Sequence, residues 1–124
     1  MNKKILIIED ESTLNKSVVD FLSAENFQVL SALDGEAGLE MAKKEIPDLI
    51  LLDIILPEKD GYEVLDELKK DEKTKNIPVI LLTNLESQED IVRAFEKGAT
   101  TYLVKSDYKL QDVAKKIKTA LGMS

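Results

Sequence analysis

Residues 49–57 read Leu-Ile-Leu-Leu-Asp-Ile-Ile-Leu-Pro, an apolar run that a single carboxylate, Asp53, interrupts. Parallel strands that are covered on both faces have continuous apolar sequences, so residues 49–52 are predicted to form a buried strand. An unpaired carboxylate inside such a strand is costly. Asp53 is therefore expected at the end of the strand, with its charge compensated, and we interpret it as the reactive group of the molecule.

The rest of the chain alternates short apolar runs with segments of helical periodicity. Strands are predicted at residues 4–8, 27–32, 49–52, 77–82 and 101–104. Apolar residues at spacings of three and four predict a helix after each of these strands. Such alternation is typical of βαβ units and a parallel sheet.

Local signals mark several helix ends. Ser12 and Asp34 are predicted N-caps, and Asn26 and Gly98 are predicted left-handed residues at helix C-termini. In the fourth helix, Ile91, Ala94 and Phe95 are expected to form the buried stripe.

The polarity of the strands predicts their order in the sheet. The first, third and fourth strands are the most uniformly apolar and are expected at the centre. The second and fifth strands carry Gln28, Ser31, Thr100 and Thr101, which suit sheet edges. The order 2-1-3-4-5 satisfies both conditions, and right-handed crossovers then place the five helices on both faces. We predict an α/β fold of the doubly wound, flavodoxin-like kind, with residues 1–124 forming a single domain.

Composition excludes several classes of function. The net charge of −7 disfavours direct contact with nucleic acid or an anionic membrane. With no cysteine and no histidine, the chain offers only oxygen ligands to a metal, which favours a hard ion such as Mg²⁺. No apolar run is long enough for a signal peptide or a membrane span, so the cytoplasm is the expected location.

Polar residues close the predicted strands at one rim of the sheet. They are Glu9 and Asp10 after the first strand, Asp53 after the third, Thr83 after the fourth and Lys105 after the fifth. Binding sites of open parallel sheets form at this rim, where the strand order reverses. Clustered carboxylates repel one another unless a cation lies between them. Asp10 and Asp53, with a loop carbonyl and water, make a reasonable Mg²⁺ site.

The same arrangement predicts phosphoryl chemistry. A carboxylate beside a divalent ion and an ammonium group can act as a nucleophile toward phosphorus. Lys105 and the metal would neutralise charge on the phosphoryl oxygens, and Thr83 could donate a hydrogen bond to one of them.

Several motifs occur together in a characteristic order. They are Ile-Ile-Glu-Asp-Glu at 7–11, Leu-Leu-Asp-Ile-Ile-Leu-Pro at 51–57, Asp-Gly at 60–61, Leu-Leu-Thr at 81–83, and Gly98-Ala99 with Tyr102 and Lys105. In this combination the chain resembles, over essentially its whole length, a stand-alone, chemotaxis-like receiver domain of a two-component response regulator.

The resemblance implies roles for individual residues. Asp53 would accept a phosphoryl group from a histidine kinase or phosphotransfer protein. Asp10, Asp53 and the backbone carbonyl of Ile55 would hold Mg²⁺, with Glu9 assisting through water. Thr83 and Tyr102 would form a switch pair.

It also implies an output. The switch pair would act on the face formed by the fourth helix, fifth strand and fifth helix, which binds a downstream protein. The chain would be a monomer or a weak phosphorylation-dependent dimer. It would not be an enzyme beyond catalysing its own phosphorylation and dephosphorylation.

Two residues depart from the pattern of the family. Ser106 stands where proline with a cis bond is usual, and Asn84 stands where a small residue is usual. These departures keep open a second hypothesis, a receiver-like protein-binding module that is not phosphorylated.

A third hypothesis is an enzyme, either a flavodoxin-like nucleotide protein or an aspartate-nucleophile phosphatase. The acids at 9–11 disfavour the first because they would repel a bound phosphate. Ile55, where the phosphatase class would need a second aspartate, disfavours the second.

Overall fold

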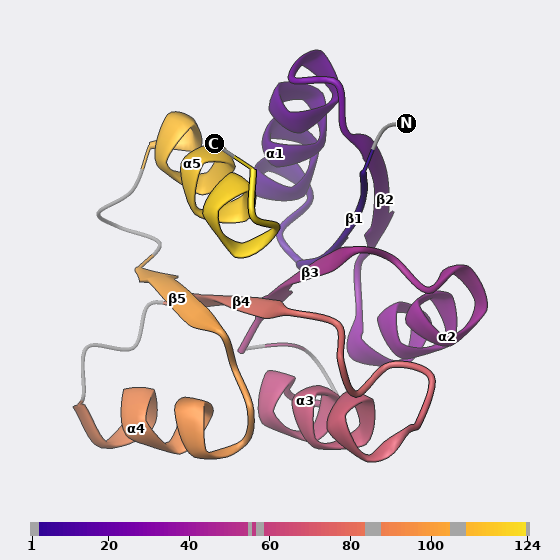
Figure 1. The fold of residues 1–124 in the computed structure, drawn as a ribbon, viewed down its shortest axis with the longest axis vertical. Helices are drawn as coiled ribbons and strands as arrows, with labels where there is room; N and C mark the ends of the chain where they lie inside the picture. The colour runs from indigo at the N-terminus through magenta and orange to yellow at the C-terminus, as the bar shows by residue number, and fades with distance from the viewer. Residues whose placement is uncertain (1–2, 55, 57–58, 84–87, 105–108, 124) are drawn as a thin grey trace.

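A computed structural model describes residues 3–54, 56, 59–83, 88–104 and 109–123 of the chain. Within these residues, strands and helices alternate from end to end (Figure 1). The strands are β1 (Lys4–Ile8), β2 (Gln28–Ala32), β3 (Leu49–Asp53), β4 (Val79–Thr83) and β5 (Thr101–Val104). The helices are α1 (Ser12–Ala24), α2 (Gly35–Glu45), α3 (Gly61–Lys70), α4 (Gln88–Glu96) and α5 (Leu110–Ala120).

The strands form one parallel sheet in the order β2-β1-β3-β4-β5, which confirms the predicted order. Helices α1 and α5 cover one face of the sheet, and α2, α3 and α4 cover the other (Figure 1). The register pairs Ile8 with both Ala32 and Leu52. Glu9, which follows β1, and Asp53, which is the last residue of β3, therefore lie side by side at one rim.

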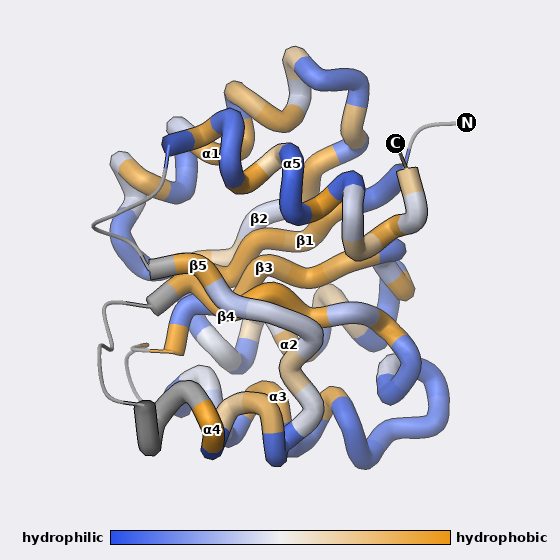
Figure 2. Tube along the Cα trace, turned by 60° about the vertical axis from the view of Figure 1, so that its left-hand side comes forward, coloured by the Kyte–Doolittle hydropathy of each residue, from blue (hydrophilic) through white to orange (hydrophobic). Residues whose placement is uncertain are grey.

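Side chains of β1 and β3 alternate between two apolar cores, one on each face of the sheet. Leu6, Ile8, Ile50 and Leu52 pack toward α2, α3 and α4. Their neighbours in sequence pack toward α1 and α5. Residues 49–52 have no exposed surface at all. Figure 2 shows this apolar layer between two more polar layers of helices.

Most predicted helix ends are confirmed. The Asp34 side chain accepts a hydrogen bond from the backbone N–H of Ala37 at 2.8 Å. Asn26 and Gly98 have positive φ values of 70° and 103°. The prediction for Ser12 was wrong by one residue, since α1 begins at Ser12 and Glu11 holds the N-cap position. Glu11 has an extended backbone, as N-cap residues do, and its N–H donates to the Glu9 side chain.

The expected buried stripe of α4 needs a correction. Ala94 is buried, but Phe95 is 43% exposed. The reason is that the α3 side of α4 carries Ala94 with the long side chains of Arg93 and Lys97. Phe95 turns instead toward β5, where its ring meets that of Tyr102 edge to face at 6.0 Å.

Among the described residues, no helix is long and apolar enough to cross a membrane.

Candidate functional site

Three carboxylates meet at the rim where β1 and β3 end. One carboxylate oxygen each from Glu9, Asp10 and Asp53 lies within 4.8 Å of the other two, the one such acidic group among the residues described. Glu9 and Asp53 are buried, with 0% and 2% exposure, whereas Asp10 is exposed. The group is therefore anchored in the fold on one side and open to solvent on the other.

Backbone hydrogen bonds at the end of β1 hold Glu9 in line with its strand. The N–H of Glu9 donates to the carbonyl of Ala32 at 3.1 Å, which continues the ladder between β1 and β2. The Glu9 Oε2 atom accepts the backbone N–H of Glu11 at 3.1 Å. The chain then turns into α1, which leaves Asp10 at the surface.

Asn15 is a residue that the sequence prediction missed. It lies on α1, is 4% exposed, and donates from Nδ2 to the carbonyls of Glu9 and Ala32 at 3.1 and 3.3 Å. A signal was present in the sequence. Asn15 shares the helical spacing of Val18 and Leu22, both buried, so a polar residue interrupts the apolar stripe of α1.

The start of α3 packs directly on the backbone of Asp53. The N–H of Gly61 donates to the carbonyl of Ile54 at 2.7 Å. A Cβ atom at position 61 would lie 2.5 Å from both the Asp53 carbonyl oxygen and the Ile54 Cα. Glycine is thus required for this close approach. Asp60 caps α3 by accepting the N–H of Glu63 at 3.0 Å.

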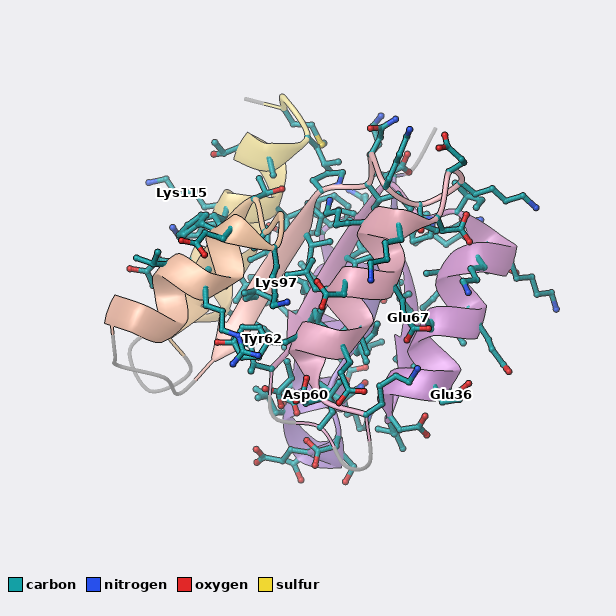
Figure 3. The ribbon with its side chains drawn as sticks, turned by 90° about the horizontal axis from the view of Figure 1, so that it is seen from below. Glu36, Asp60, Tyr62, Glu67, Lys97 and Lys115 are labelled. Atoms are coloured by element: carbon teal, nitrogen blue, oxygen red, sulfur yellow. The ribbon has the colours of Figure 1, made fainter. Side chains whose placement is uncertain are left out.

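Lys59 ties the segment before α3 to two helices. Its Nζ atom forms ion pairs with Glu67 of α3 and, at 3.8 Å, with Glu36 of α2. The hydrogen bond with Glu67 raises the pKa of Lys59 above its usual value, against a smaller opposing effect of burial. Figure 3 shows Glu67 and Glu36 on the neighbouring helices α3 and α2, to the right of Asp60.

Comparison with known proteins identifies the family. The profile of the response regulator receiver domain matches residues 5–118. The chain belongs to this family.

The receiver domain is 44% identical over 121 residues to the transcriptional regulatory protein CiaR of Streptococcus pneumoniae. The match covers 98% of the chain and 52% of that protein, so the chain spans about half the length of this relative. A CheY-like receiver domain protein from Methanospirillum hungatei has a similar structure, with a TM-score of 0.91 and 30% identity, over 98% of this chain and 95% of that one.

The receiver domain of a sensor histidine kinase from Pseudomonas aeruginosa gives a TM-score of 0.89 at 26% identity, over 98% of this chain and 99% of that one. That structure has a magnesium ion coordinated in its active-site cleft.

The three clustered carboxylates of this receiver domain suit the same kind of ion. Every ligand offered by Glu9, Asp10 and Asp53 is a carboxylate oxygen, and Mg²⁺ prefers oxygen. The exposure of Asp10 leaves room for the water ligands that Mg²⁺ usually retains.

The other predicted site residues are described in part or not at all. Thr83 ends β4 and pairs in register with Val104, but its side chain lies outside the described part of the structure. Tyr102 is half-buried on β5 against Phe95. The remaining predicted residues lie outside the described residues; these are Ile55, Asn84, Lys105 and Ser106.

Proposed function

We propose that this receiver domain is a signalling switch in which Asp53 accepts a phosphoryl group. The observation that carries the proposal is the approach of three carboxylates to within 4.8 Å, with Asp53 held on the rigid central strand. The donor would be a histidine kinase or a phosphotransfer protein, as membership of the family suggests.

Each step of the transfer has a residue assigned to it. A carboxylate oxygen of Asp53 forms a bond to phosphorus as the bond from phosphorus to the donor's histidine nitrogen breaks, and the imidazole keeps the electron pair. Asp10, Asp53 and the Ile55 carbonyl would hold Mg²⁺, with Glu9 acting through water. The ion would neutralise charge on the phosphoryl oxygens. Lys105 and Thr83 would contact those oxygens.

The output would pass through the face formed by α4, β5 and α5. Thr83 and Tyr102 would link the phosphoryl group to this face. Val92 and Phe95 of α4 are 53% and 43% exposed there, which suits contact with a downstream protein. We further propose that residues 1–124 act as one cytoplasmic domain, a monomer or weak phosphorylation-dependent dimer, with no catalytic activity beyond its own phosphorylation and dephosphorylation.

Phosphodonor labelling tests the assignment of Asp53. With Mg²⁺ and a small acyl phosphate, the wild-type chain should gain the mass of one phosphoryl group, and chelation of Mg²⁺ should prevent the gain. Asp53→Asn should remain unlabelled. Asp60→Asn is the matched control, because asparagine also caps helices and Asp60 is a neighbouring carboxylate.

Two results would count against the proposal. Labelling of Asp53→Asn at the wild-type rate would exclude Asp53 as the acceptor. A folded, Mg²⁺-binding wild type that takes up no phosphoryl group would instead favour the unphosphorylated protein-binding module, for which Asn84 and Ser106 are the sequence arguments.

A further inference from the structure

We propose that Asn15 is a positioning residue for the acidic group, and that its side-chain amide sets the metal affinity of the site. This inference rests on the proposed function, since it concerns the same carboxylates. Asn15 is on α1 and contributes no carboxylate to the acidic group.

The hydrogen bonds of Asn15 take the place of backbone hydrogen bonds that β2 no longer provides to β1 beyond Ala32. β1 and β2 pair up to Ile8 and Ala32, after which β2 leaves the sheet toward α2. The N–H of Glu9 still reaches the Ala32 carbonyl, but the Glu9 carbonyl lies beyond the last residue of β2. The Asn15 Nδ2 group supplies a donor to this carbonyl and a second donor to Ala32.

Glu9 is consequently held at three of its atoms. Its N–H donates to Ala32, its carbonyl accepts from Asn15, and its Oε2 accepts from Glu11. The side chain is completely buried, so it has little room to adjust if one of these bonds is lost. Because Glu9 lies within 4.8 Å of Asp10 and Asp53, a shift of its backbone would alter the spacing of all three carboxylates.

The amide is suited to this task because it is neutral and donates twice. The two hydrogens on Nδ2 match the two carbonyl acceptors, and burial strengthens both bonds. Leucine has nearly the same size and shape but no donor. Asn15→Leu therefore removes the hydrogen bonds while it keeps the packing of α1 on the sheet.

A buried threonine far from the rim provides a matched control. The Thr74 Oγ1 atom is fully buried and donates to the carbonyl of Leu68 at 2.7 Å, at the other end of the sheet. Thr74→Val thus also removes a buried bond from a side chain to a backbone carbonyl. Both variants should be less stable to urea than the wild type. Only Asn15→Leu should affect the acidic group.

The first measurement is Mg²⁺ binding to the folded proteins, by calorimetry. Asn15→Leu should weaken binding by about tenfold or more, as is typical when a residue that orients metal ligands is lost. Thr74→Val should bind like the wild type. Equal Mg²⁺ affinity of Asn15→Leu and wild type would overturn the inference and leave the proposed function standing.

The second measurement needs no metal. Exchange of the Glu11 amide with water reports whether the Glu9 carboxylate is still in place, because Glu9 Oε2 accepts that N–H. In Asn15→Leu, the exchange rate of the Glu11 amide should be at least several times higher than in the wild type, after correction for global stability. In Thr74→Val it should be unchanged. Unchanged exchange would overturn the inference. If the wild type binds no Mg²⁺, the proposed metal site fails and the effect of Asn15 on metal affinity fails with it, and amide exchange then decides only whether Asn15 positions Glu9.

Discussion

Gly61 is the residue at which β3, the strand that ends in Asp53, and the next helix are brought into backbone contact. A side chain at this position would overlap the Asp53 carbonyl oxygen and the Ile54 Cα, which are backbone atoms and cannot rotate away. Glycine is a poor helix former, but here it is the first residue of α3, where the intrinsic cost is small beside the cost of a clash. The contact fixes α3 relative to Asp53.

We expect Gly61→Ala to destabilise the protein by about 1–3 kcal/mol, the usual cost of overpacking. It should also slow phosphorylation, since the displaced atoms belong to Asp53 and its neighbour. Urea denaturation and phosphodonor labelling measure the two effects.

Gly38→Ala is the control for this prediction. A Cβ atom there would come within 2.5 Å of the Ile8 side chain, in the core and away from the Asp53 backbone. It should reduce stability with little change in the labelling rate per folded molecule. A Gly61→Ala protein that is as stable and as rapidly labelled as the wild type would show that the close approach is unimportant.

Single residues also show where sequence-based prediction succeeded and where it did not. Glu9, Asp10 and Asp53 were placed together correctly because each follows an apolar run of the sequence, and the strand order brings the ends of these runs to one rim. Asn15 was missed because its role depends on where β2 leaves the sheet. The phosphoryl-transfer roles of these residues remain predictions.

At the scale of elements, the described side chains connect α4 to α3 through a cation–π contact and an ion pair. The Arg93 guanidinium lies 4.1 Å from the centre of the Tyr62 ring. One turn further on, Lys97 Nζ forms a 2.8 Å ion pair with Asp66. Figure 3 shows Tyr62 and Lys97 between the two helices. Because Tyr62 follows Gly61, these contacts connect α4 to the end of β3 through a single helix.

We expect Lys97→Met to loosen α4 selectively. Partly exposed ion pairs contribute about 0–1 kcal/mol, so amide exchange in α4 should accelerate by no more than about fivefold. Hydrogen exchange measured by NMR for each helix provides the test.

Lys118→Met is the matched control for this prediction. Lys118 pairs with Glu25 at 3.5 Å and joins α5 to the end of α1, with similar exposure of both side chains. Loss of the ion pair between Lys118 and Glu25 should leave amide exchange in α4 unchanged. If both variants accelerate α4 equally, the Lys97 pair has no local role.

The prediction that Phe95 is buried was wrong because of the way α4 packs on its neighbours. Helical spacing identifies an apolar stripe but does not say which neighbour covers it. The α3 side of α4 is occupied by Arg93, Ala94 and Lys97, so Phe95 faces β5. The positions of the strands were not ambiguous in this way, because β1 and β3 are apolar on both faces and must lie at the centre of the sheet.

Considered as a whole, the molecule gathers three carboxylates at the ends of two of its most buried strands. The net charge is −7, and two of the three clustered carboxylates are buried. Two like charges about 4 Å apart repel by about 1 kcal/mol in water and by more inside a protein. The fold therefore tolerates repulsion at the rim that a bound cation would relieve.

We predict that Mg²⁺ and Asp53→Asn each stabilise the protein, and that their effects are not additive. Without metal, Asp53→Asn should raise the free energy of unfolding by about 1 kcal/mol, because it removes one charge from the group. Mg²⁺ at 100 times its Kd should stabilise the wild type by about 2.7 kcal/mol. The variant should gain much less, since it has lost a ligand.

Urea denaturation with EDTA or Mg²⁺, at ionic strength matched with NaCl, separates binding from screening. Equal stabilisation of both proteins by Mg²⁺ would place the ion elsewhere on the surface and remove the physical basis for a metal-assisted reaction at Asp53.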